Sequence, residues 1–176
     1  MRPAKIIECE VPVASVLDRK TVQTAYFRDS YRAPLARADS SVIDVFFGVF
    51  GHRPSWMNGA LILRNRIAGA CGLDPATDSE LLDNQPKASY RVGENIGPWP
   101  IFALTPTELV AGRDDKHLDF RLSILIEQEG GVRSAVISTI CTVHNWAGKV
   151  YLFFIVPFHK WGVKLLIRRA MAARRL

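Results

Sequence analysis

The chain has 176 residues, of which 48% are apolar and 23% are charged. This length and composition predict one folded domain spanning residues 1–176 and exclude a largely disordered chain. The net charge of +6 arises at one end, because residues 160–176 contain six lysines or arginines and no acid, whereas the rest of the chain is balanced. A basic tail without a broad cationic face or a nucleic-acid-reading motif argues against a nucleic-acid partner.

Three cysteines, Cys9, Cys71 and Cys141, lie far apart and outside any metal-ligand spacing. They predict neither a disulfide framework nor a zinc site. No secretory signal is visible at the start, and the apolar run at 150–158 is about half of the ~20 residues that a spanning helix needs. We therefore expect a cytoplasmic protein with no targeting segment, no metal and no cofactor.

In chain order, residues 1–24 are interpreted as an N-terminal extension, and the aromatic-rich residues 26–36 predict a first strand. A short helix follows, capped at Asp39 or Ser40 and carrying apolar residues at spacings of three and four. The same spacing predicts a second helix over 56–71. Two helices are thus expected after the first strand.

Residues 73–100 are rich in Asp, Asn, Pro and Gly, with one candidate strand at 88–92. A connection of this length is uncommon in a compact domain unless it is functional. We interpret it as a flap over a site.

Beyond this connection the pattern becomes that of an antiparallel meander. Residues 117–127 alternate, with one apolar face made of Leu118, Phe120, Leu122, Ile124 and Ile126. A Gly-Gly hairpin leads into a long β-branched strand over 132–145, and a Gly-bearing turn at 145–149 leads into a last strand at 150–156, ended by Pro157.

Residues 158–176 predict a long C-terminal helix with one apolar stripe and a basic opposite face. The stripe could close the concave side of the sheet or lie in a membrane. Burying Trp161, Leu165 and Leu166 is worth roughly 1.5–3 kcal/mol each, against about 1 kcal/mol for each cation near an anionic surface. Packing on the sheet is therefore favoured, and weak contact with an anionic membrane, through Lys160, Lys164 and Arg168, stays open as a secondary use.

The expected fold is α+β, with a curved antiparallel sheet of about six or seven strands around the C-terminal helix. The segments 54–73, 97–104, 114–124 and 139–160 also resemble, in order, the pattern of a bacterial family, domain of unknown function 2867, so the resemblance covers about residues 26–170. That family is similar to the START-like (SRPBCC) helix-grip superfamily, which includes polyketide cyclases. The resemblance implies a cavity for an apolar or amphipathic small molecule but no activity, since the family has none assigned.

Seven residues are candidates for contact with a ligand in such a cavity: Arg64, Trp99, Asp119, Arg121, His144, His159 and Trp161. Arg64 could hold a carboxylate, although a snorkelling or salt-bridged arginine would also explain it. Asp119 and Arg121 share a strand face and could pair or orient a polar group, or simply face water. The tryptophans could line the cavity or fill the core.

His144 and His159 could each act as a base near neutral pH with Asp119 as partner, and a structural hydrogen bond is the alternative for both. No nucleophile elbow, P-loop, dinucleotide fingerprint or HExxH motif is present. Three classes remain: a binder of an apolar small molecule, an enzyme of cyclisation or dehydration using the same cavity, and a peripheral membrane or scaffold module. The sequence leaves the catalytic residues and the oligomeric state open.

Overall fold

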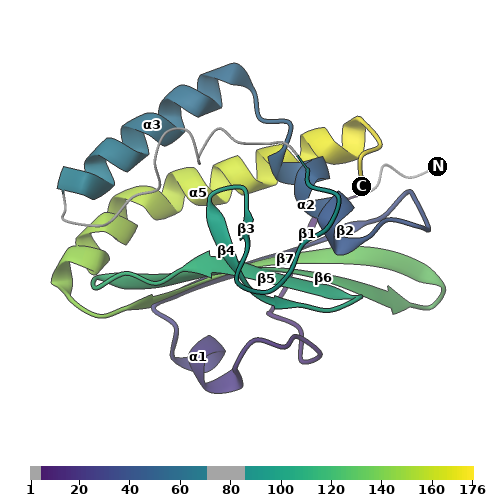
Figure 1. Cartoon of the computed structure of the whole chain (residues 1–176), viewed down its shortest axis with the longest axis horizontal. Coiled ribbons are helices and arrows are strands. Elements are labelled where there is room, and N and C mark those ends of the chain that lie inside the picture. The colour runs from purple at the N-terminus through teal and green to yellow at the C-terminus, as the bar shows by residue number, and fades with distance from the viewer. Residues whose placement is uncertain (1–4, 71–85) are drawn as a thin grey trace.

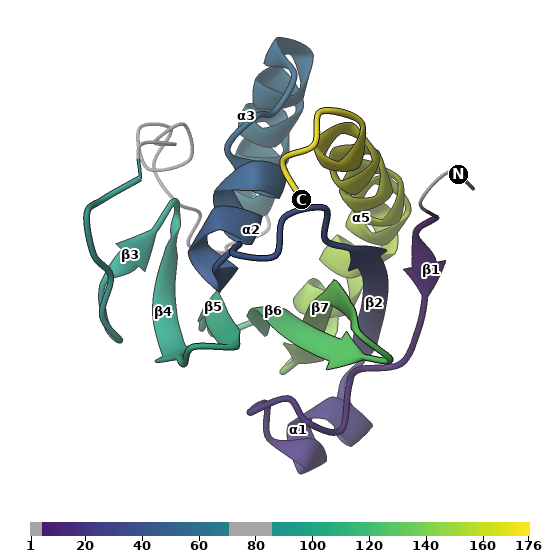
Figure 2. The same ribbon diagram turned by 90° about the vertical axis from the view of Figure 1, so that its right-hand side faces the viewer.

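The computed structural model describes residues 5–70 and 86–176. In chain order their elements are β1 (Ile7–Glu8), α1 (Arg19–Thr24), β2 (Phe27–Pro34), α2 (Val42–Phe50), α3 (Ser55–Ala70), β3 (Asn95–Ile96), β4 (Trp99–Leu104), β5 (Glu108–Arg113), β6 (Leu118–Glu129), β7 (Val132–Val143) and α5 (Trp146–Ala172). These seven strands form one antiparallel sheet in the order β1-β2-β7-β6-β5-β4-β3. The sheet curves around α2 and α5, and α1 lies on its opposite face (Figure 1 and Figure 2). The α+β helix-grip prediction is confirmed.

The centre of the sheet is the long hairpin of β6 and β7. These strands pair along their whole length, from Leu118 opposite Val143 to Glu129 opposite Val132. Gly130 and Gly131, at φ of 56° and 81°, form the turn, because a tight hairpin needs positive φ that glycine adopts without strain. Both the alternating strand and the Gly-Gly hairpin were predicted from the sequence.

Helix α2 anchors one end of the core. Its cap is Ser41, whose side chain accepts from the Asp44 amide while Asp44 accepts from the Ser41 amide, so the predicted cap at Asp39 or Ser40 was slightly early. A Cβ on Gly48 would lie 2.7 Å from the Arg175 carbonyl oxygen, so only glycine allows the C-terminus to pack on this helix.

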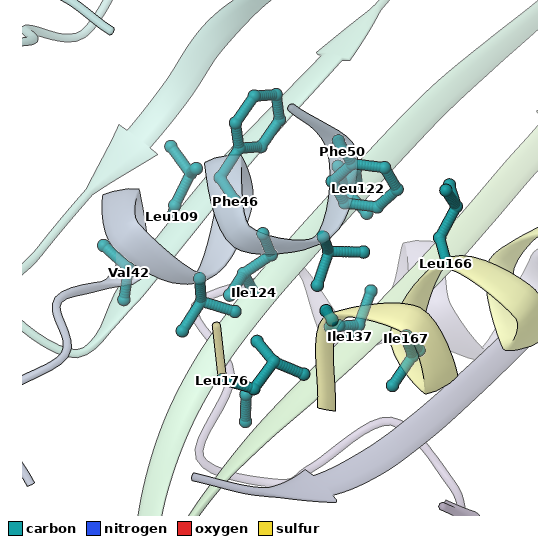
Figure 3. Packing of buried hydrophobic residues seen from close by; sticks show 14 of the residues in the cluster. Val42, Phe46, Phe50, Leu109, Leu122, Ile124, Ile137, Leu166, Ile167 and Leu176 are labelled. Carbon is teal, nitrogen blue, oxygen red and sulfur yellow. The ribbon is translucent and has the colours of Figure 1, made fainter. Parts of the chain in front are cut away.

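The main core lies between the sheet, α2 and the second half of α5. Figure 3 shows α2 side chains meeting sheet side chains and the end of α5 in one cluster. Its labelled members are Val42, Phe46, Phe50, Leu109, Leu122, Ile124, Ile137, Leu166, Ile167 and Leu176.

The predicted last strand at 150–156 is wrong, because these residues belong to α5, which begins at Trp146 instead of Phe158. The Asn145 side chain accepts from the Gly148 amide, so the segment interpreted as a turn is the N-cap of this helix. Every residue from 150 to 156 is apolar, so this segment has no hydrophobic periodicity that would distinguish a strand from a helix. Pro157 lies inside the helix and does not end a strand.

The predicted apolar stripe of the C-terminal helix is also partly wrong. Leu166 is buried, but Phe158 and Trp161 are exposed. The helix turns its Val163, Leu166 and Ile167 side chains into the core instead.

Three further differences concern the connecting segments. The extension at 1–24 contains β1 and α1. The second helix ends at Ala70, and residues 71–85, with Cys71 and the first part of the predicted flap, lie outside the described residues. Within the rest of the flap, 88–92 is not a strand, and β3 and the start of β4 occupy its end. Both strands are short and β4 contains Pro100, so they lack the alternation that identifies longer strands.

Candidate ligand cavity

A small cavity of about 60 Å³ lies between the sheet, α3 and the first half of α5. Its lining is mostly apolar and consists of Phe27, Arg64, Leu118, Phe120, Thr139, Cys141, Tyr151, Leu152, Ile155, Val156 and His159. This is the place at which the helix-grip resemblance implies a ligand cavity.

The register of three strands builds the floor of this cavity. Cys141 on β7 lies opposite Phe27 on β2 and opposite Phe120 on β6, which makes one row across the sheet. Side chains alternate along each strand, so Thr139 and its partner Asp29 lie on the same face in the next row. The roof comes from α5, whose lining residues recur at spacings of three and four.

Arg64 brings a cation to the cavity wall from α3. Its guanidinium carbon lies 5.6 Å from the centroid of the Tyr151 ring, and its Nη1 donates to Asn65 Oδ1 at 3.1 Å. In the described part of the chain no carboxylate forms an ion pair with it. A cation of this kind, beside apolar walls, can bind a carboxylate or a phosphate in a bidentate manner.

His159 faces the cavity with a buried carboxylate beside it. Its Nε2 lies 3.3 Å from Oδ1 of Asp29, whose side chain is 1% exposed. The Tyr31 hydroxyl donates to the other oxygen of Asp29 at 3.0 Å, and burial together with the Asp29 charge raises the pKa of Tyr31. Asp29 therefore accepts a hydrogen bond from the Tyr31 phenol, which stays protonated. The same carboxylate orients the His159 ring, which could exchange a proton with a ligand.

Cys141 on the cavity floor behaves as an apolar wall. Burial raises the pKa of its thiol to about 12, with a smaller contribution from the Asp29 charge. Because the thiolate is the nucleophilic form, this cysteine is inert at neutral pH.

Two predicted residues, Asp119 and Arg121, lie on the other face of the sheet. Their neighbours on β6, Leu118 and Phe120, line the cavity, and adjacent side chains of a strand point to opposite faces. Arg121 forms an ion pair with Asp114. The two residues therefore do not pair with each other.

The remaining candidates also lie away from the cavity lining. The Nε2 atom of His144 lies 3.0 Å from Oδ2 of Asp119. This pair is therefore on the opposite side of the sheet from His159. Trp99 packs in the core against Phe120, with 5.5 Å between ring centroids. Trp161 is 56% exposed. Of the seven predicted residues, the structure brings Arg64 and His159 together at the cavity.

Sequence reasoning missed Asp29 and Tyr151. Asp29 stands between Phe27 and Tyr31 in a predicted strand, so it is an acid on what alternation identifies as an apolar face. Asp29 could therefore have been identified from the sequence. Tyr151 was hidden by the wrong strand prediction at 150–156.

A wider open groove of about 650 Å³ runs along β1 and the start of β2. Its lining carries both signs of charge, and two of its acids already have partners: Glu10 lies 3.7 Å from Arg28, and Glu8 lies 2.9 Å from Lys164. The groove is polar and open to water, and Phe27 lines both this groove and the small cavity.

The comparisons with known proteins identify the family. A family model described as "Protein of unknown function (DUF2867)" matches residues 21–166. The chain belongs to this family. CalU16 from Micromonospora echinospora is a solved structure to which the chain is similar at 14% identity, over 98% of this chain and 92% of that one, with a TM-score of 0.33. None of the curated proteins compared with the chain matches it.

Proposed function

We propose that this protein binds an amphipathic molecule that carries a carboxylate or phosphate, in the cavity between the sheet and the first half of α5. The observation that carries the proposal is the Arg64 guanidinium at an apolar wall, with no carboxylate partner in the described part of the chain. An acidic ligand group would supply that partner while its apolar part contacts Phe27, Leu152 and Ile155. The free thiols of Cys9 and Cys141 are compatible with a cytoplasmic location.

Binding requires the cavity to grow. Its volume of about 60 Å³ has room for only a few water molecules, whereas ligand pockets usually measure roughly 300–1,000 Å³. The wall formed by α3 and the first half of α5 must therefore move outward when a ligand enters.

Three features of this wall support such a movement. Its inner side is held by a small cluster of Ala68, Leu118, Cys141, Tyr151 and Leu152. On its outer side Phe153 and Phe158 are 76% and 73% exposed, so the described part of the chain does not cover these two side chains from outside. Pro157 removes a backbone hydrogen bond near the middle of α5, and such a position bends more easily.

The test has two stages, beginning with native mass spectrometry of protein purified from cells and extraction of any retained compound. A dansyl-labelled fatty acid is then titrated into wild type and two arginine variants. We expect Arg64→Met to weaken binding at least tenfold, while Arg66→Met, an exposed arginine on the same helix, leaves binding unchanged. Empty spectra together with equal affinities for both variants would contradict the proposal.

A second candidate function, a proton-transfer enzyme, is favoured by the contact between His159 and Asp29. The carboxylate beside this base is Asp29, not the Asp119 suggested by the sequence. If the cavity is an active site, wild type converts the compound extracted from it and His159→Asn does not. No conversion by wild type would leave binding as the function.

A further inference from the structure

The outer face of α5 carries a row of exposed large apolar side chains, which we call the aromatic ridge: Trp146, Val150, Phe153, Phe154, Phe158 and Trp161. Their spacing places them along one side of the helix, opposite the side chains that line the cavity. A helix that is apolar all round is normally buried in a protein or in a membrane. Apart from Lys149, this half of α5 is apolar all round, and the described part of the chain covers it on one side only.

Helix α3 extends this surface. It exposes Trp56, Leu63 and Ile67, and the Trp56 ring lies 5.4 Å from the Trp161 ring. Contacts of Trp56 with Trp161 and of Arg64 with Tyr151 show that α3 runs antiparallel to α5. Both helices lie on the side of the sheet away from α1 (Figure 2).

The charged side chains on the two helices of this surface have one sign. Helices α3 and α5 contain no Asp or Glu and seven cations, which are Arg64, Arg66, Lys149, Lys160, Lys164, Arg168 and Arg169. Arg66, Lys149, Arg168 and Arg169 are exposed. Two copies of such a face would repel each other, whereas an anionic lipid surface complements both its charge and its apolar side chains.

We propose that the aromatic ridge docks on the surface of an anionic lipid bilayer, with its rings at the boundary between headgroups and acyl chains and the cations near lipid phosphates. By length and apolarity α5, with 27 residues, could cross a membrane. Its second half, however, is packed into the core through Val163, Leu166 and Ile167. The helix therefore lies in the plane of the interface and does not span the bilayer.

The docking residues differ from those that the sequence suggested. Lys164 is paired with Glu8 at 2.9 Å, and Lys160 lies 5.8 Å from the Phe27 ring centroid. Arg168 is exposed and remains part of the proposed surface. The apolar side chains of the ridge provide the main contact, and this proposal holds whether or not the cavity binds a ligand.

Co-sedimentation of the full chain with phosphatidylcholine vesicles, with and without phosphatidylserine, tests the proposal. We expect binding to the phosphatidylserine vesicles, weakened by salt, and a blue shift of tryptophan emission on binding. The variant Phe153→Ser/Phe158→Ser should bind at least tenfold more weakly. The control Val13→Ser/Val132→Ser, which removes exposed apolar side chains outside α3 and α5, should bind as wild type does.

Three outcomes would overturn the proposal: no binding by wild type to either vesicle, equal loss in the ridge and control variants, or a wild-type dimer in light scattering that the ridge variant dissociates. The last would assign the ridge to a second copy of the chain. Thermal unfolding of each variant checks that the fold is intact, and the exposed positions should leave the melting temperature unchanged.

Discussion

The two halves of α5 differ in composition and in surroundings. The second half buries Val163, Leu166 and Ile167 between the sheet and α2, and its cations face outward. The first half covers a small cavity and leaves Phe153 and Phe158 in contact with solvent. The comparison teaches that one helix stabilises the core at one end, whereas at the other end it covers a small cavity and leaves aromatic side chains exposed.

The largest expected difference is in stability. Ile167→Ala removes a fully buried side chain and should lower the free energy of unfolding by about 2–5 kcal/mol. Phe158→Ala, in the exposed half, should change it by no more than about 0.5 kcal/mol. Urea unfolding measures both, and similar losses would break the comparison.

A pair of glycines, one near each end of the wall, tests how α5 packs on its neighbours. A Cβ at Gly148 would lie 2.4 Å from the His117 carbonyl oxygen, so Gly148→Ala should destabilise the protein by about 1–3 kcal/mol. At Gly162 the nearest atom is the Met57 methyl at 4.0 Å, so Gly162→Ala should stabilise it by about 0.5–1 kcal/mol through helix propensity. Opposite signs in urea unfolding support the assigned packing, and equal signs argue against it.

Replacing the internal proline should stiffen the wall. Pro157→Ala restores a backbone donor inside α5 and should stabilise the helix by up to about 3 kcal/mol. It should also slow hydrogen exchange in the first half and weaken ligand binding. Faster exchange in this variant would show that the proline does not loosen the helix.

The smallest expected effect is a loss of stability at alkaline pH. It is caused by Cys141, which lies on the cavity floor beneath the first half of α5. Burial raises the pKa of Cys141 to about 12 from its ordinary value of 9.0, so the folded protein keeps a proton that the unfolded chain releases. Stability should therefore fall as the pH rises above 9, by at most about 1.4 kcal/mol per pH unit. Cys141→Ala should reduce this slope between pH 9 and 10, and the slope that remains comes from Cys9, whose pKa is also raised by burial.

Where the sequence has a clear period, its structure was predictable. Leu118, Leu122 and Ile124 alternate on β6, and the spacing of Val45, Phe46 and Val49 identifies α2. The segment 150–156 lacks a period, because both faces of that part of α5 are apolar. Prediction from hydrophobicity assumes that large apolar residues are buried, and Phe153 and Trp161 break that assumption.

The candidate site was predictable only in part. Arg64 was identified because it interrupts apolar neighbours, and His159 because it follows the apolar run. Their proximity at the cavity depends on the antiparallel packing of α3 against α5, which could not be predicted from the sequence. The contact of His159 with Asp29, far apart in the chain, depends on the packing of α5 across β2.

Hydrogen exchange along α5, with and without the dansyl-labelled fatty acid, tests most directly whether its first half is a movable wall over a ligand cavity. The account predicts rapid exchange at 150–158, slow exchange at 163–170, and protection by the ligand confined to the first half and α3. Equally slow exchange in both halves, with no change on adding the ligand, would contradict it.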